Sequence, residues 1–119
     1  MEKRLYGRTL VCYLAGELDL QAAMFLRQDL EKELQAPMVE QLLLDFSRVT
    51  FIDSSGLGVI LGRYRQVTDL GKEMAIAGAS AAVCRVLELG GLGRLVPFYP
   101  TVAEALPANA GGQLDGNDS

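Results

Sequence analysis

The sequence contains no histidine among its 119 residues. This excludes Ser-His-Asp and Cys-His nucleophilic sites and removes the commonest nitrogen ligand of zinc. The two cysteines, Cys12 and Cys84, lie far apart and form no metal-binding cluster by themselves. Apolar residues flank each of them, so we interpret both as buried core residues without a disulfide. The composition therefore argues against much hydrolytic chemistry, and we expect no metal and no cofactor.

The chain also lacks an excess of positive charge. Eleven Lys and Arg residues stand against fifteen Asp and Glu, which gives a net charge of −4. Direct binding to nucleic acid is not expected, because it needs a field of Lys and Arg that neutralises phosphates. No apolar run approaches the ~20 residues of a membrane-spanning helix, and no signal-peptide core follows Met1. We therefore expect a cytoplasmic protein that does not bind membranes.

Strand-like and helix-like segments alternate along the chain. Apolar runs predict strands at 4–6, 10–15, 41–46, 73–77 and 95–99, and periodic or capped segments predict helices at 22–35, 55–70, 81–89 and 102–106. Residues 16–19 are expected to end the second strand, and residues 47–49 to form a link. Alternating strands and helices predict an α/β domain with a mixed, mostly parallel sheet of four to five strands and about four helices. Residues 107–119 have little to bury and are predicted to be a disordered tail.

One stretch joins a predicted strand to a predicted helix, and it carries Asp53, Ser54 and Ser55. A side-chain oxygen just before an apolar helical run accepts hydrogen bonds from the first unpaired backbone N–H groups. Taken as residues alone, both serines are candidate N-caps. Asp53 either forms the turn or orients the Ser54 hydroxyl. In an open α/β sheet this edge is where ligands and partners usually bind.

Asp19 and Ser80 are predicted to cap the helices that follow them, and either could also contact a partner. Gly56, Gly58 and Gly62 lie in or near a predicted helix, where each costs roughly 1 kcal/mol relative to Ala. Gly58 and Gly62 share one helical face, and such a smooth surface lets another backbone approach closely. The glycine spacing is one residue too long for a dinucleotide fingerprint.

Three segments carry a resemblance to a known family: Gly16–Asp19, Leu43–Phe46 and above all Phe51–Tyr64. They resemble STAS domains and, more narrowly, the SpoIIAA-like anti-anti-sigma factors, which antagonise the anti-sigma F factor of sporulation. The resemblance covers about residues 2–106, so a single STAS domain over 1–106 is expected. It implies that an anti-sigma factor that is also a serine kinase phosphorylates Ser54. The unphosphorylated protein would bind that anti-sigma factor and free its sigma factor, and a PP2C-type phosphatase would reset the switch.

The resemblance further implies a protein that is a substrate and not an enzyme, and a monomer when free. The partner-binding residues are then expected to be Asp19, Asp53, Ser54, Ser55, Gly56, Gly58, Gly62 and Ser80. Two alternatives stay open. One is a nucleotide-binding STAS domain with weak NTPase activity, in which Asp19, Asp45 and Asp53 would hold Mg²⁺. The other is a STAS scaffold of a stress-signalling complex.

Overall fold

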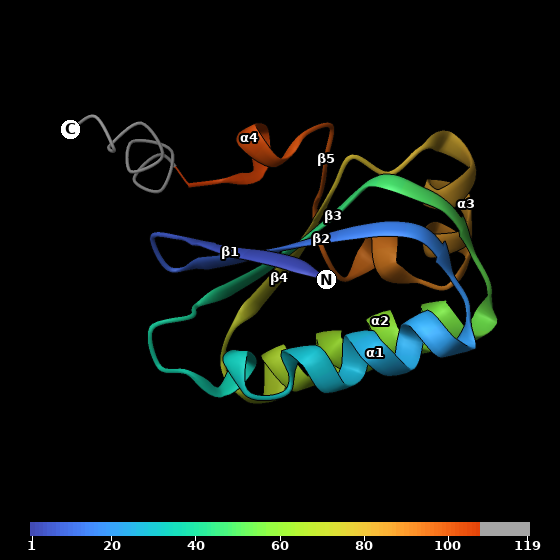
Figure 1. Ribbon diagram of the computed structural model, residues 1–119. Coiled ribbons are helices and arrows are strands. Elements are labelled where there is room, and N and C mark those ends of the chain that lie inside the picture. Colours follow the sequence, from blue (N-terminus) through green and yellow to red (C-terminus); the bar gives the residue numbers. More distant parts are fainter. Residues whose placement is uncertain (108–119) are drawn as a thin grey trace.

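Strands and helices alternate along the chain in the computed structural model, which describes residues 1–107 (Figure 1). The elements are β1 (Glu2–Tyr6), β2 (Thr9–Leu18), α1 (Leu20–Leu30), η1 (Glu33–Gln35), β3 (Gln41–Ile52), α2 (Ser54–Asp69), β4 (Glu73–Ala77), α3 (Ala81–Leu89), η2 (Leu92–Arg94), β5 (Phe98–Tyr99) and α4 (Val102–Ala105). This confirms the predicted order and adds two short 3-10 helices, η1 and η2. The predicted disordered tail lies outside the described residues, apart from Pro107. Within 1–107, no helix has the length and hydropathy to cross a bilayer.

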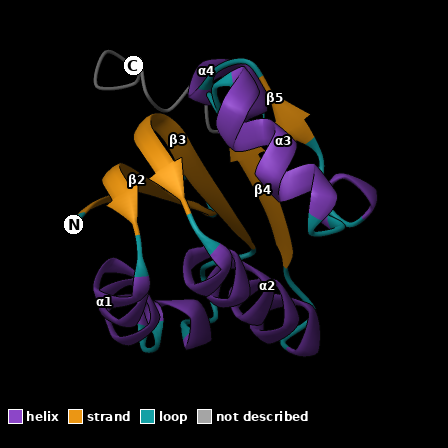
Figure 2. Ribbon diagram, turned by 90° about the vertical axis from the view of Figure 1, so that its right-hand side faces the viewer, coloured by secondary structure: helices purple, strands orange, loops and turns teal. Residues whose placement is uncertain are grey.

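The sheet follows the order of the chain, β1-β2-β3-β4-β5. β1 is antiparallel to β2, and the other neighbours are parallel, which confirms the predicted mixed, mostly parallel sheet. From β2 through β5, each new parallel strand is added on the same side of the strand before it. Right-handed crossovers in one direction leave their helices on one face, and α1, α2 and α3 cover that face (Figure 2). β5 is an edge strand, as Pro97 indicated.

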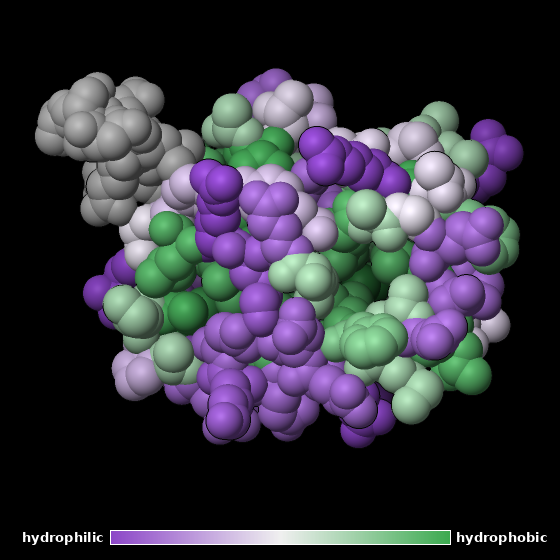
Figure 3. All heavy atoms as spheres, in the orientation of Figure 1, coloured by the Kyte–Doolittle hydropathy of each residue, from purple (hydrophilic) through white to green (hydrophobic). Residues whose placement is uncertain are grey.

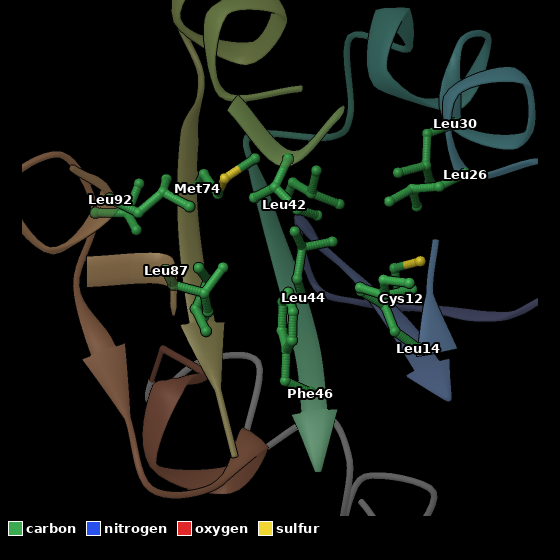
Figure 4. Packing of buried hydrophobic residues seen from close by; sticks show 14 of the residues in the cluster. Cys12, Leu14, Leu26, Leu30, Leu42, Leu44, Phe46, Met74, Leu87 and Leu92 are labelled. Carbon is green, nitrogen blue, oxygen red and sulfur yellow. The ribbon is translucent and has the colours of Figure 1, made fainter. Parts of the chain in front are cut away.

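The main core lies between the sheet and helices α1–α3. Alternate residues of each strand point into it, since side chains alternate between the two faces of a strand. Figure 4 shows side chains from β2, β3 and β4 directed towards the helices: Cys12, Leu14, Leu42, Leu44, Phe46 and Met74, with Leu26, Leu30 and Leu87 opposite. The residues between them face the other side, where a smaller cluster joins Val11 and Leu43 to α4. Burial on both faces explains the consecutive leucines of β3.

β2 and β3 are longer than the sequence predicted. The expected break at 16–19 and the expected link at 47–49 are both wrong, because β2 continues to Leu18 and β3 to Ile52. Gly16 has a φ of +77°, in the left-handed region that glycine adopts readily. The β2–β3 register shifts on either side of Gly16, as at a β-bulge. This irregularity lets pairing continue to Leu18 opposite Ile52, so that the two strands end side by side.

The two helices beneath these strand ends also differ in detail from the prediction. α1 ends at Leu30, short of the predicted residue 35. Four apolar residues spaced by three and four, which the periodicity of the sequence puts near one helical face, are all buried: Ala23, Leu26, Leu30 and Leu34. The buried face of α2 consists of Gly56, Ile60, Arg63 and Val67. Leu57, Leu61 and Tyr64, which apolar periodicity alone would place in the core, are only partly buried. Arg63 is 8% exposed and donates to the Arg27 carbonyl oxygen at 3.2 Å. Burial lowers the pKa of its guanidinium.

The C-terminal part of the sheet and the cysteines bring two further corrections. The last strand covers only Phe98–Tyr99, because Leu95 and Val96 donate their N–H groups back to the Leu92 carbonyl oxygen and not to a neighbouring strand. Both cysteines were expected in the core, but only Cys12 is buried and Cys84 is half-buried. Burial raises the pKa of the Cys12 thiol to about 12. Burial and the neighbouring Glu88 carboxylate also raise the pKa of Cys84.

Iodoacetamide at mildly alkaline pH should label Cys84 and spare Cys12 in the folded protein. The thiolate is the reacting form, and Cys12 combines a raised pKa with full burial. Peptide mass spectrometry after timed quenching measures both rates, and the urea-unfolded chain, with both thiols labelled, is the control. Equal labelling rates in the folded protein would contradict the placement of Cys12.

Candidate functional site

The candidate site lies where β2 and β3 end and two helices begin. The residues that follow the two strands, Asp19 and Asp53, are the N-caps of α1 and α2. The backbone N–H of Asp53 donates to the Leu18 carbonyl oxygen at 3.4 Å, so the two turns lie against each other. Because β2 and β3 are neighbours in the sheet, Asp19 lies beside the turn that carries Ser54.

Both cap carboxylates bind backbone. Asp19 Oδ1 accepts from the N–H of Ala22 at 3.1 Å, and Asp53 Oδ1 accepts from the N–H of Gly56 at 3.0 Å. A helix N-terminus leaves its first N–H groups unpaired and carries a partial positive charge. The two helix N-termini lie side by side, and one carboxylate accepts a hydrogen bond from each of them. The prediction that Asp19 is a cap and that Asp53 accepts backbone hydrogen bonds is confirmed.

Ser54 is the first helical residue of α2 and is exposed, whereas Ser55 is half-buried. Neither serine is the N-cap, because Asp53 occupies that position. The interpretation of the two serines as N-caps is therefore wrong. Within residues 1–107, no hydrogen bond is formed by the Ser54 hydroxyl. The turn thus presents an exposed, unbonded hydroxyl group, that of Ser54, at the start of a sixteen-residue helix.

The three glycines of α2 fall into two groups. Gly56 is buried, and a Cβ there would overlap the Leu18 carbonyl oxygen and lie 3.0 Å from the Ile52 side chain. Its small size lets α2 start directly against the end of β2, so the expected contact of Gly56 with a partner does not agree with its position. A Cβ at Gly58 or Gly62 would meet no atom within 4 Å. These two glycines leave the helix surface open, as a close-approach surface requires.

Ser80 does not lie with the other predicted partner-binding residues. Its hydroxyl accepts from the N–H of Val83 at 3.2 Å, which confirms it as the cap of α3. The other end of α3 is the one near α2, since a Cβ at Gly90 would overlap the Leu57 side chain. A nine-residue helix is about 14 Å long. Ser80 therefore lies at the opposite end of α3 from the contact with α2.

Two exposed apolar residues next to the caps were missed from the sequence. Leu20 follows Asp19 and is 62% exposed, and Phe51 precedes the Ile52–Asp53 pair and is 52% exposed. For Phe51 the sequence did contain a signal. Side chains alternate between the two faces of a strand, so if Ile52 points into the core, Phe51 must point away from it. Apolar side chains beside a free hydroxyl suit contact with a protein.

The aspartates considered for Mg²⁺ do not converge. Asp45 is buried and accepts from the Ser47 N–H at 3.1 Å and from the Ser47 hydroxyl at 2.9 Å. It lies seven residues before Ile52 on β3, or about 23 Å along an extended strand. In the described part of the chain, no three His, Cys, Asp or Glu residues are placed to hold a metal ion. The metal-dependent form of the nucleotide-binding alternative gains no support from this geometry.

The fold and this turn define a STAS domain: the chain matches the STAS family model over residues 1–105 and belongs to that family. It is 37% identical over 106 residues to the anti-sigma F factor antagonist of Paenibacillus polymyxa, across 89% of this chain and 91% of that protein. The unphosphorylated anti-sigma factor antagonist SpoIIAA superposes with a TM-score of 0.78 at 28% identity, over 97% and 96% of the two chains. The phosphorylated form of the Bacillus cell fate determinant SpoIIAA gives 0.72 at 30% identity, over 87% and 94%. The family and fold predicted from three short segments are confirmed.

Asp53→Ala should destabilise the protein by about 1 kcal/mol, because it removes the side chain that caps α2. Asp53→Asn keeps an oxygen acceptor at the same place and should cost much less. Urea unfolding followed by far-UV circular dichroism measures both. An equal loss in the two variants would indicate that the carboxylate charge, and not the cap hydrogen bond, stabilises the turn.

Gly56→Ala should destabilise the protein by about 3 kcal/mol, since the added methyl group meets the backbone of Leu18 and overpacking typically costs this much. Gly58→Ala is the matched control in the same helix. It should be neutral or stabilise by up to ~1 kcal/mol, because alanine favours a helix and the site is open. Urea midpoints compare the two, and a tolerated Gly56→Ala would contradict the close packing of α2 on β2.

Proposed function

We propose that this chain is an anti-sigma factor antagonist that is switched by phosphorylation of Ser54. The unphosphorylated protein binds an anti-sigma factor that is also a serine kinase, and the sigma factor is released. A PP2C-type phosphatase restores the binding form. The chain is the substrate of both enzymes and catalyses no reaction itself. The observation that carries the proposal is the exposed, unbonded Ser54 hydroxyl at the start of α2, in a chain 37% identical to an anti-sigma F factor antagonist.

A phosphate on Ser54 is compatible with the fold. It adds about −1.5 to −2 charges and three acceptor oxygens. At the first residue of α2 it faces unpaired N–H groups and the positive end of the helix dipole, which stabilises an exposed anion by typically 0.3–1 kcal/mol. The carboxylates of Asp19 and Asp53 oppose this gain by like-charge repulsion. Because the two effects are small and opposite, the modified protein stays folded.

Phosphorylation should have a larger effect on the affinity for a partner that packs against the turn than on the stability of the fold. We call the exposed surface around Ser54 the switch surface: Asp19, Asp53, Ser54, Ser55, Gly58 and Gly62. The glycines allow a partner backbone to approach closely. A dianion at the centre of such a contact faces desolvation and repulsion that can cost several kcal/mol. Each 1.4 kcal/mol is a tenfold change in affinity, so phosphorylation should weaken binding by about 100-fold or more.

Ser80 takes no part in the switch surface in this proposal, since it caps the far end of α3. The chain would act as a cytoplasmic monomer that alternates between the anti-sigma factor and the phosphatase. Recognition would use the shape and charge of the turn, with no metal or cofactor.

Incubation with the cognate anti-sigma kinase and ATP, followed by peptide mapping, should place a single phosphate on Ser54. Ser54→Ala should not be modified and should bind the anti-sigma factor persistently, whereas Ser54→Asp should bind about 100-fold more weakly. Ser55→Ala is the matched control and should be phosphorylated normally. Isothermal titration calorimetry measures the affinities. Phosphate on Ser55, or on neither serine, would refute the assignment.

The phosphorylated and unphosphorylated proteins should melt at nearly the same temperature, because the modification acts at an interface and leaves the fold intact. Differential scanning calorimetry of the two forms tests this. Similar melting together with equal affinity for the anti-sigma factor would contradict the proposed exclusion mechanism.

A further inference from the structure

Half of β2 has an unpaired edge. β1 pairs with residues 9–13 of β2, and the register begins at Glu2 opposite Tyr13. β2 then runs on to Leu18, and among the described residues no strand lies along that side of residues 14–18. Their other side is paired with β3. An open strand edge presents a row of backbone N–H and C=O groups to which another chain can pair.

A groove of about 410 Å³ lies beside this edge. Leu14 and Leu18 of β2 form one wall, Ala22 and Phe25 of α1 form the floor, and Met1 closes one end. Figure 3 shows it as an apolar hollow between β2 and α1. Phe25 is 65% exposed, although it is a large apolar side chain. Apolar walls beside unpaired backbone groups are suited to an extended peptide.

The opposite rim of the groove carries a positive charge. Arg48 of β3 lies opposite Ala15 of β2 and lines the groove. Within residues 1–107, Arg48 forms no ion pair. Glu2, the acidic residue at the rim, lies 3.3 Å from the Arg4 guanidinium. The rim can therefore accept a carboxylate from outside.

We propose that this groove binds one extended segment of a protein partner by strand addition to β2, in line with β1. The segment pairs with the backbone of residues 14–18. Its apolar side chains, at alternate positions, pack on Leu14, Leu18 and Phe25, and a carboxylate on its other face meets Arg48. Backbone pairing provides affinity in this mode, and the alternating pockets provide specificity.

A single strand fits this edge better than a second copy of the chain. Paired strands lie about 4.8 Å apart, whereas packed helices need 8–10 Å between their axes. Because α1 lies under the β2 edge, pairing of two copies there would force their two α1 helices into the same space. A lone extended segment has no helix beneath it. The inference does not depend on phosphorylation of Ser54, although the groove ends at Leu18, one residue before Asp19.

The test uses the full chain, labelled with ¹⁵N, and an acetylated and amidated peptide of sequence Thr-Val-Asp-Val-Thr-Val-Thr. Its valines share one face of a strand, and its aspartate lies on the other. Titration should shift the amide signals of residues 14–18 and slow their hydrogen exchange, because new backbone hydrogen bonds form. A peptide with proline at the central valine cannot donate that hydrogen bond and should bind weakly.

Variants of the protein and of the peptide test the apolar contact with Phe25 and the charge contact with Arg48 separately. Phe25→Ala should weaken binding by about fivefold or more, since it removes the apolar floor. Phe51→Ala is the matched control, an exposed phenylalanine of β3 that does not line the groove, and should bind as the unmodified protein does. Replacing the peptide's Asp by Lys should weaken binding by about two- to fivefold. Arg48→Gln should abolish that preference.

The proposal is overturned if no amide of residues 14–18 shifts at millimolar peptide. It is also overturned if Phe25→Ala and Phe51→Ala have equal effects. Shifts of the same amides on raising the protein concentration alone, with a doubled mass in sedimentation, would instead identify a second copy as the occupant. Both variants replace exposed side chains, so thermal melting of each confirms that it is folded before titration.

Discussion

The pairing of β2 with β3 through to Leu18 and Ile52 is the constraint on which the rest of the site depends. The two strands must end at the same level for α1 and α2 to start side by side. The extra length of β3 makes this possible, because each of the two register shifts, after Tyr13 and after Gly16, places one more residue on β3 than on β2 without ending the ladder. Gly56 completes the arrangement, since any side chain there would push α2 away from Leu18. The register of β2 with β3 and the small size of Gly56, two residues after Ser54, thus set where the Ser54 hydroxyl lies.

The electrostatics of the turn follow from the same arrangement. Two adjacent helix N-termini concentrate unpaired donors, and Asp19 and Asp53 each satisfy one of them. One oxygen of each carboxylate is bound to backbone, and Ser54 is the exposed serine of this edge, whereas Ser55 is half-buried. In the proposed switch, the kinase would meet a Ser54 hydroxyl that needs no hydrogen bond broken before it reacts. The remaining N–H groups then lie where a phosphate would need them.

The sequence predicted those features that depend on local chemistry. The order of elements, the caps at Asp19 and Ser80, and the four inward residues of α1 follow from apolar periodicity and short side-chain oxygens. The strand lengths and the role of Gly56 were not predicted, because they depend on contacts between segments far apart in the chain. A glycine with a positive φ inside a strand looks the same in sequence as one that ends it. Arg63 was overlooked on the buried face of α2 for a related reason, since its partner, the Arg27 carbonyl, belongs to another helix.

The identity between sheet order and chain order has a consequence for how the domain is made. Each strand pairs with the one synthesised just before it, so no strand waits for a later segment to be inserted beside it. The β1–β2 step closes over a two-residue turn, and each later step closes over the segment that carries α1, α2 or α3, which keeps the entropy cost of each step low. The sheet can therefore grow in one direction during translation, from β1 towards β5. The turn that presents Ser54 is then complete before the C-terminal third of the chain has been synthesised.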